Sequence, residues 1–211
     1  MNVDIRYLLS MSCVLPAVVG IYRYNKIDRK YHPLIYMMML TAVIETIFYI
    51  ALKFAALHIP TRFVVNIYML VNFFLFLYFV QINNYISKRA LQWLLVFAGI
   101  ICLFNYIYER TFLKAFPFLL CYVSAVMMII SIDILSRQIM VIKQKLANNF
   151  WVWVSIFSII YNAFTLLIYS QLFFAVTNKQ NVNPIANIHH FANLVCYVFF
   201  AVAIFKIPEK K

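Results

Sequence analysis

Long apolar stretches alternate with short polar segments along the whole chain. Seven of these stretches approach the roughly 20 mostly apolar residues that an α-helix needs to cross a bilayer. Their approximate bounds are 7–22, 34–57, 63–82, 90–108, 115–135, 150–176 and 185–205. The pattern predicts an all-α, polytopic membrane helix bundle with seven transmembrane helices, formed by residues 1–211 as a single domain.

The composition agrees with a lipid environment. Of the 211 residues, 66% are hydrophobic and only 11% are charged, whereas soluble domains contain about 25% charged residues. The polar segments are too short for a separate soluble domain. Because the chain has only two glycines, helix contacts of the GxxxG type should be rare, and large side chains should fill the bundle.

The positive charges predict the orientation of the bundle in the membrane. Of the 18 Lys and Arg residues, twelve belong to one set of loops and six to the other. The richer side should face the cytoplasm, which places the N-terminus outside and the C-terminus inside. The twelve are Arg23, Lys26, Arg29, Lys30, Lys88, Arg89, Arg137, Lys143, Lys145, Lys206, Lys210 and Lys211.

Four polar side chains interrupt the apolar stretches at a similar predicted depth, near the bilayer centre. They are Glu45, Asn72, Asn162 and Asn193, on four different helices. Polar groups are costly in lipid, so each one needs a partner or a cavity. We expect a polar pocket between the second, third, sixth and seventh helices. The alternative is a hydrogen-bond network that only fixes helix packing, as Asn, Ser and Thr often do in membrane bundles.

Other polar residues repeat at helical spacing beside these four and extend them into stripes. The stripes are Thr41–Glu45; Tyr68–Asn72; Ser158–Asn162–Thr165–Tyr169; and His189–Asn193–Tyr197. The candidate ligand-binding residues are Glu45, Tyr68, Asn72, Asn162, Thr165, His189 and Asn193. Glu45 has no evident cationic partner at its depth, so it is either a protonated hydrogen-bond donor or a proton-linked site.

No motif indicates catalysis or a cofactor. Phosphate-binding, dinucleotide-binding, zinc-protease and serine-hydrolase motifs are missing. His189 and His190 point about 100° apart on a helix, so they do not form one compact metal or haem site. We therefore expect no cofactor, no metal site and no nucleic-acid partner, and we favour a non-enzymatic role. We interpret the four cysteines as packing residues; they are Cys13, Cys102, Cys121 and Cys196.

The longest segment between apolar stretches is residues 136–149, with the sequence SRQIMVIKQKLANN. It predicts a basic cytoplasmic loop, and the alternative is a short amphipathic helix on the membrane surface. Just before it, Asp133 and Arg137 are four residues apart, which predicts an ion pair on one helix face. This segment is the expected docking surface if the protein acts through a partner.

The third and seventh stretches begin alike, with N-I-x-x-x-x-N from Asn66 to Asn72 and again from Asn187 to Asn193. Both predicted helices run from outside to inside. The first three and the last three helices could thus be parallel repeats joined by the fourth, an arrangement of 3+1+3. Such repeats occur in transporters, with the substrate site near the midplane. The alternative is a chance match of three identities.

Four short motifs permit a broader comparison. They are Gly20-Ile21-Tyr22-Arg23, Glu45, Asn66-Ile67-Tyr68 and Ile188-His189-His190. With these motifs the chain resembles a group of small seven-span bacterial membrane proteins, common in Bacteroidota, that have no assigned activity. The resemblance implies a multi-pass protein of the bacterial cytoplasmic (inner) membrane. Asn72 stands where that group would have an acidic residue, which weakens any mechanism that needs two carboxylates.

Two functional hypotheses follow from these patterns. The first is a protein that binds or transports a small-molecule ligand through the polar pocket. The second is a membrane sensor or assembly subunit that acts through a membrane or cytoplasmic protein partner, since the short loops leave no room for an effector domain. An intramembrane lipid enzyme is a third alternative, but no nucleophile or metal site supports it.

Overall fold

The described part of the chain is all-helical, as predicted. The structure, a computed structural model, describes residues 11–54, 61–110, 116–141, 148–174 and 179–210. Within them it forms no strand, apart from a single bridge between Ile27 and Glu209. The helices are η1 (Met11–Cys13), α2 (Val14–Arg23), η2 (Tyr24–Lys26), η3 (Arg29–Tyr31), α3 (His32–Phe54), α4 (Thr61–Ile82), α5 (Lys88–Glu109), α6 (Pro117–Val141), α7 (Phe150–Phe174) and α8 (Lys179–Phe205).

Each predicted stretch corresponds to one α-helix. The first stretch, predicted from residue 7, is α-helical only from Val14, after the 3-10 helix η1, and its residues 7–10 lie outside the described residues. Two further boundaries differ. The prediction of a loop over residues 136–149 is wrong for its first part, because α6 continues to Val141. This part contains no glycine or proline to end the helix, and the ion pair between Asp133 and Arg137 crosses the predicted boundary. The rest of that segment, 142–147, lies outside the described residues. The other difference is that α8 begins at Lys179, six residues before the predicted start.

Five segments of the described chain are long and apolar enough to cross a membrane. They are Arg29–Ile50, Phe63–Ile82, Lys88–Glu109, Pro117–Met140 and Phe150–Ser170. Two further helices have shorter apolar segments, which are the ten residues of α2 and Phe191–Phe205 of α8. These lengths indicate an integral membrane protein built as a helix bundle.

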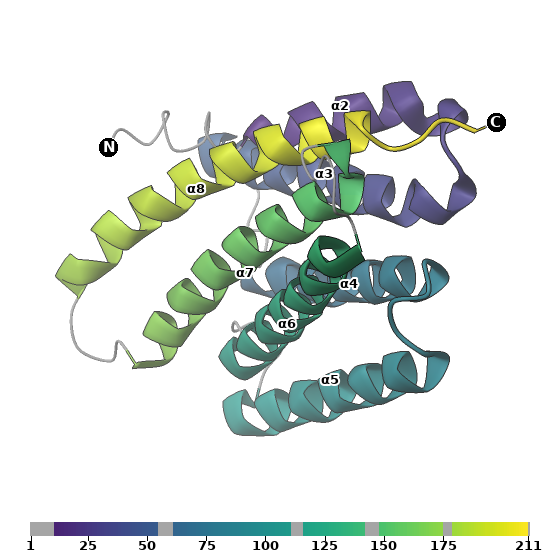
Figure 1. The fold of residues 1–211 in the computed structure, drawn as a ribbon. Coiled ribbons are helices and arrows are strands. Elements are labelled where there is room, and N and C mark those ends of the chain that lie inside the picture. Colours follow the sequence, from purple (N-terminus) through teal and green to yellow (C-terminus); the bar gives the residue numbers. More distant parts are fainter. Residues whose placement is uncertain (1–10, 55–60, 111–115, 142–147, 175–178, 211) are drawn as a thin grey trace.

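Within the described residues, six α-helices form a ring and α5 lies outside it. The ring follows the chain: α2 packs against α3, α3 against α4, α4 against α6, α6 against α7, α7 against α8, and α8 against α2. The outer helix α5 contacts α4 and α6 at the edge of the bundle (Figure 1). Sequential packing of this kind arises with or without an internal repeat, so the 3+1+3 arrangement stays a prediction.

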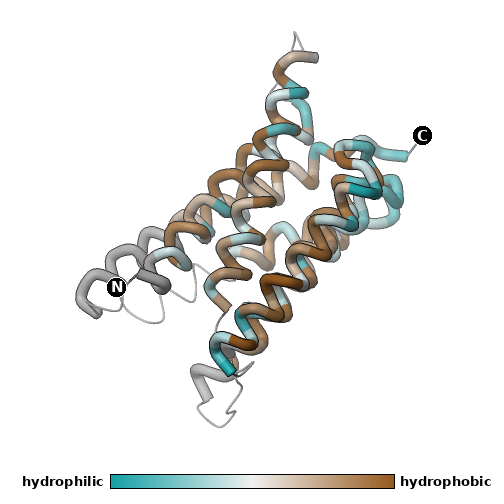
Figure 2. The backbone as a smooth tube through the Cα atoms, turned by 90° about the horizontal axis from the view of Figure 1, so that it is seen from below, coloured by the Kyte–Doolittle hydropathy of each residue, from teal (hydrophilic) through white to brown (hydrophobic). Residues whose placement is uncertain are grey.

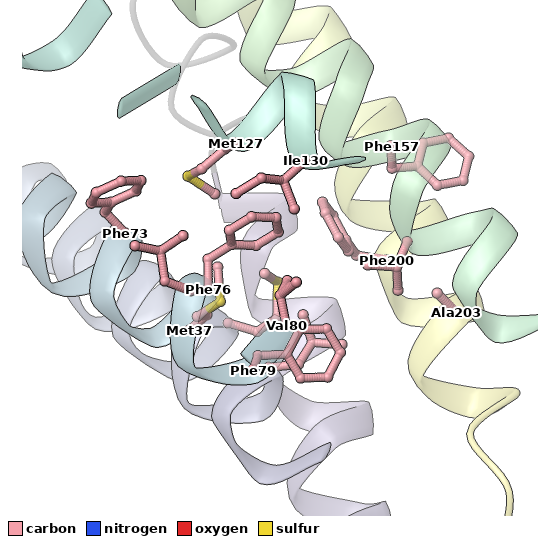
Figure 3. Packing of buried hydrophobic residues seen from close by; sticks show 14 of the residues in the cluster. Met37, Phe73, Phe76, Phe79, Val80, Met127, Ile130, Phe157, Phe200 and Ala203 are labelled. Atoms are coloured by element: carbon pink, nitrogen blue, oxygen red, sulfur yellow. The ribbon is translucent and has the colours of Figure 1, made fainter. Parts of the chain in front are cut away.

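The hydrophobic core lies inside the ring and includes buried residues of α3, α4, α6, α7 and α8. Phe73 and Phe79 of α4 are completely buried. Figure 3 shows Phe76 of α4 close to Met127 and Ile130 of α6, with Phe200 of α8 on the other side. Large side chains fill the space between these helices, as the scarcity of glycine predicted.

Polar contacts join several segments at the end of the bundle that holds the C-terminus. Asn83 Nδ2 donates to Lys30 O at 3.2 Å, and Gln138 Nε2 donates to Tyr85 OH at 2.7 Å. Burial raises the pKa of Tyr85 to about 12, so its hydroxyl is neutral and accepts this bond. Figure 2 shows hydrophilic residues gathered at the same end. Backbone and side-chain contacts bring Arg23, Lys26, Lys30 and Lys210 to it, and we call it the basic end.

Arg23 joins the end of α2 to the end of α8. Its side chain is buried, and its Nη1 and Nη2 atoms donate to Phe205 O at 2.9 Å and Ile207 O at 2.5 Å. Nη1 also lies 3.7 Å from Glu209 Oε1. The last carbonyls of a helix have no partner within that helix, so Arg23 supplies the missing donors. We call this contact the Arg23 junction; it closes the ring between its first and last helices.

Candidate functional site

Two adjoining cavities lie between the helices. The larger one, the Glu45 cavity, has a volume of about 220 Å³ and is bounded by α3, α4, α7 and α8. The smaller one, the Asn162 cavity, has about 50 Å³ and is bounded by the same four helices and α6. Tyr68, Met69 and Tyr161 line both and form a common wall. The four shared helices are those between which the sequence predicted a pocket.

The structure brings six of the seven candidate residues to these cavities. Glu45, Tyr68, Thr165 and Asn193 line the Glu45 cavity, whereas Tyr68, Asn72 and Asn162 line the Asn162 cavity. The seventh, His189, belongs to α8, and its side chain lies outside the described residues, as does that of His190. Whether these residues bind a ligand stays a prediction.

Tyr68 is fixed in the common wall by a hydrogen bond between α3 and α4. Thr41 Oγ1 donates to Met37 O at 2.8 Å, one turn earlier on α3. Thr41 Oγ1 also lies 2.9 Å from Tyr68 OH. Since the single Thr41 proton is already used, the tyrosine donates to the threonine. The predicted pairing of the polar faces of α3 and α4 thus includes a direct contact that orients Tyr68.

Buried amide oxygens lie in the wall of the Asn162 cavity. Asn162 is 1% exposed, and its Nδ2 donates to Ser158 O at 2.8 Å and to Ser158 Oγ at 3.3 Å. Its Oδ1 has no hydrogen-bond partner among the described residues, and the same holds for Oδ1 of Asn72, which is 8% exposed. A buried acceptor without a partner costs about 1–3 kcal/mol. Asn105 Oδ1, Ser124 Oγ and Ser155 Oγ, which line neither cavity, also lack a partner among the described residues. What distinguishes the two asparagine oxygens is their position in a cavity wall, where a bound molecule can donate to them.

Glu45 gives the larger cavity its charge. It is the only charged side chain among the described residues that line either cavity. The ion pairs of the described residues join Arg23 to Glu209 and Arg137 to Asp133, and neither includes Glu45. The carboxyl group therefore faces the cavity without a cationic partner from that part of the chain.

Several cavity residues were missed by the sequence reasoning, among them two aromatic residues that bear on the chemistry of the site. Tyr161 lines both cavities and Phe48 lines the Glu45 cavity, but neither belongs to a predicted stripe. Tyr161 precedes Asn162 and points about 100° away from it. Because α7 packs between α6 and α8, two neighbouring positions can both face the interior. The ring of Tyr161 reaches that of Tyr197 on α8, with 6.1 Å between the centroids.

Two other predictions concern residues outside the cavities. The predicted ion pair is confirmed, with Arg137 Nη2 at 2.8 Å from Asp133 Oδ2. All four cysteines are free, and Cys13 and Cys196 are fully buried, as expected for packing residues. No group of three or more metal-binding side chains occurs within the parts of the chain that the structure describes.

Comparisons of the chain with protein-family models, with curated proteins and with solved structures find no match.

Proposed function

We propose that the protein binds a small solute in the Glu45 and Asn162 cavities and that this binding is part of a transport cycle. The observation that supports the proposal best is the convergence of polar residues from four helices on two cavities in an otherwise apolar bundle. Its residues are Glu45, Tyr68, Asn72, Asn162, Thr165 and Asn193. Sites of this kind are concave and mostly apolar, with a few polar groups that fix the ligand's orientation.

We further propose that all seven α-helices cross the bacterial cytoplasmic membrane, with the N-terminus outside. The support is the gathering of cations at the basic end, which the positive-inside rule assigns to the cytoplasm. Along α3, which begins at the basic end, Glu45 follows Met37 and Thr41. The Glu45 cavity would thus lie towards the outer surface and the Asn162 cavity deeper, and a solute from outside would reach Glu45 first.

A cavity-filling variant tests this proposal. Thr165 is buried and lines the Glu45 cavity, so Thr165→Phe should occupy that space. Leu167, on the same helix, is an exposed apolar residue, and Leu167→Phe is a matched control that leaves the cavity open. Native mass spectrometry of protein extracted gently from its own host should show a bound small molecule in the wild type and in Leu167→Phe, but not in Thr165→Phe.

Two results would contradict the proposal. A molecule retained by folded Thr165→Phe would bind elsewhere. A wild type that is empty on extraction, and that binds none of the probes described below, would show that the cavities are not a solute site.

A further inference from the structure

The surroundings of Glu45 contain no positive charge within the described residues. Five titratable groups of the described residues interact with its carboxyl group, and they come from η1, α4, α7 and α8. They are Cys13 of η1, Tyr68 of α4, Tyr161 and Tyr169 of α7, and Tyr197 of α8. Thiols and phenols are uncharged near neutral pH. None of them can act as a counter-ion, so no side chain that the structure describes competes with a bound cation for this carboxylate.

Aromatic side chains from three helices form part of the wall of the Glu45 cavity. Phe48, Tyr68, Tyr161 and Tyr169 line it from α3, α4 and α7. The negative face of an aromatic ring attracts cations, and quaternary ammonium groups are recognised in this way. A carboxylate among aromatic rings therefore favours a positively charged ligand and disfavours an anion.

The other residues of the cavity wall suit an organic cation better than a divalent metal ion. Ca²⁺ prefers six to eight oxygen ligands, and Mg²⁺ requires near-octahedral oxygen coordination. The cavity instead contains apolar side chains such as Ile44, Val65 and Ile168 beside its single carboxylate. Its volume of about 220 Å³ lies below the roughly 300–1,000 Å³ of sites for drug-sized ligands, which indicates a ligand of few atoms.

On the premise that the cavities bind a solute, which is the proposed function, we propose that this solute is a small organic cation. Its ammonium group, protonated or quaternary, pairs with the Glu45 carboxylate and lies against the tyrosine rings. The Thr165 hydroxyl and the Asn193 amide, in the same wall, provide polar contacts for the remainder of the molecule.

This arrangement predicts that protons compete with the bound cation for the Glu45 carboxylate. A proton and an ammonium group neutralise the same carboxylate, so they exclude each other. Binding should therefore weaken as the pH falls and the carboxyl group is protonated. A quaternary ammonium ligand has no titratable proton of its own, so any pH dependence of its affinity must come from the protein.

The test compares charged probes with a neutral isostere on the full chain in nanodiscs of uncharged lipid. Titration calorimetry would measure tetramethylammonium, choline and 3,3-dimethyl-1-butanol, in which carbon replaces the nitrogen of choline. The wild type should bind choline at least about tenfold more tightly than the isostere, because only choline can pair its charge with the carboxylate. This preference should disappear in Glu45→Gln, together with the dependence on pH. Asp133→Asn, at an exposed carboxylate, should retain both.

The opposite results separate the two proposals. Equal affinities of choline and its isostere for the wild type, with both lost in Thr165→Phe, would overturn the cation inference and leave the proposed function in place. Undiminished choline binding by Glu45→Gln would also overturn it. If neither cation binds while the native mass spectrum shows a neutral or anionic molecule, the cation inference alone is wrong. If no probe binds and the extracted protein is empty, both proposals fail.

Discussion

Buried polar groups at the basic end and in the cavities differ in their hydrogen-bond partners. At the basic end, the Nη atoms of Arg23 donate to two carbonyl groups of the C-terminal segment. Fully buried apolar residues, Ile27 and Ile207 among them, surround that contact. In the cavities, Asn72 and Asn162 have buried amide oxygens without a partner among the described residues. The two carbonyl groups at the basic end thus have donors, although Arg23 Nε has no partner among the described residues, whereas the cavities leave amide oxygens available.

This difference indicates which part of the molecule stabilises the fold and which part serves function. Most buried polar groups in proteins are hydrogen-bonded, and an exception needs a physical reason. Proteins tolerate a local loss of stability chiefly at functional sites, where ligand binding compensates for that loss. We therefore expect substitutions at the basic end to reduce stability, and substitutions in the cavities to change binding with little effect on stability.

The largest effect should follow from removal of the Arg23 junction. Arg23→Met keeps an apolar stem but removes the donors to Phe205 O and Ile207 O, which should cost roughly 3 kcal/mol. Arg137→Met removes an exposed ion pair with Asp133 and should cost less than about 1 kcal/mol. Thermal unfolding in detergent, followed by intrinsic fluorescence, would measure both. Equal midpoints for the two variants would show that the junction does not stabilise the bundle.

Two asparagines permit a direct comparison of satisfied and unsatisfied amides. Asn66 Oδ1 accepts from Phe116 N at 3.0 Å, at the start of α6. Asn66→Leu leaves that N–H without this partner and should destabilise the protein by about 1–2 kcal/mol. Asn162→Leu removes an acceptor that has no described partner, together with the bonds from Nδ2 to Ser158 within the same helix. It should therefore cost less stability than Asn66→Leu, while it weakens ligand binding. A larger loss of stability in Asn162→Leu than in Asn66→Leu would reverse the assignment of the two regions.

The two glycines provide a third, smaller contrast. A Cβ atom at Gly20 would lie 2.9 Å from Ile35 Cγ2, where α2 meets α3, whereas a Cβ at Gly99 would have no atom within 4 Å. Overpacking typically costs about 1–3 kcal/mol, and replacing glycine in a helix gains about 1 kcal/mol. Gly20→Ala should therefore lower stability by about 1 kcal/mol, and Gly99→Ala should leave it unchanged or raise it. The same unfolding assay applies, and a more stable Gly20→Ala would mean that Ile35 moves freely.

The helices were predictable because a bilayer imposes a strong constraint on length and hydrophobicity. A rise of about 1.5 Å per residue was enough to predict one level for Glu45, Asn72, Asn162 and Asn193. The structure brings these four residues to two adjoining cavities. Local spacing also predicted the ion pair of Asp133 with Arg137, since both residues belong to one helix face.

Contacts between distant segments were not predictable in this way. Arg23 counted only as one of twelve loop cations, and its partner Phe205 O is 182 residues away. Tyr161 was missed because its role depends on the helices on both sides of α7. The sequence also did not predict the position of α5 outside the ring, because the lipid-facing and bundle-facing sides of a transmembrane helix can be equally apolar.

The smallest predicted effect concerns the boundary between the two regions. Ser131 Oγ of α6 donates to Ser158 Oγ of α7 at 2.7 Å, and Ser158 in turn accepts from Asn162 in the cavity wall. Hydrogen bonds between membrane helices average about 0.6 kcal/mol in double-mutant cycles, so a cycle of Ser131→Ala and Ser158→Ala should give a coupling of that size. Ser158→Ala should also weaken ligand binding, because Ser158 lines the Asn162 cavity and its Oγ accepts from Asn162, whereas Ser131→Ala should not. If Ser131→Ala and Ser158→Ala weaken ligand binding equally, the contact between α6 and α7 and the cavity wall act together. Stability and binding would then not be separable on α7.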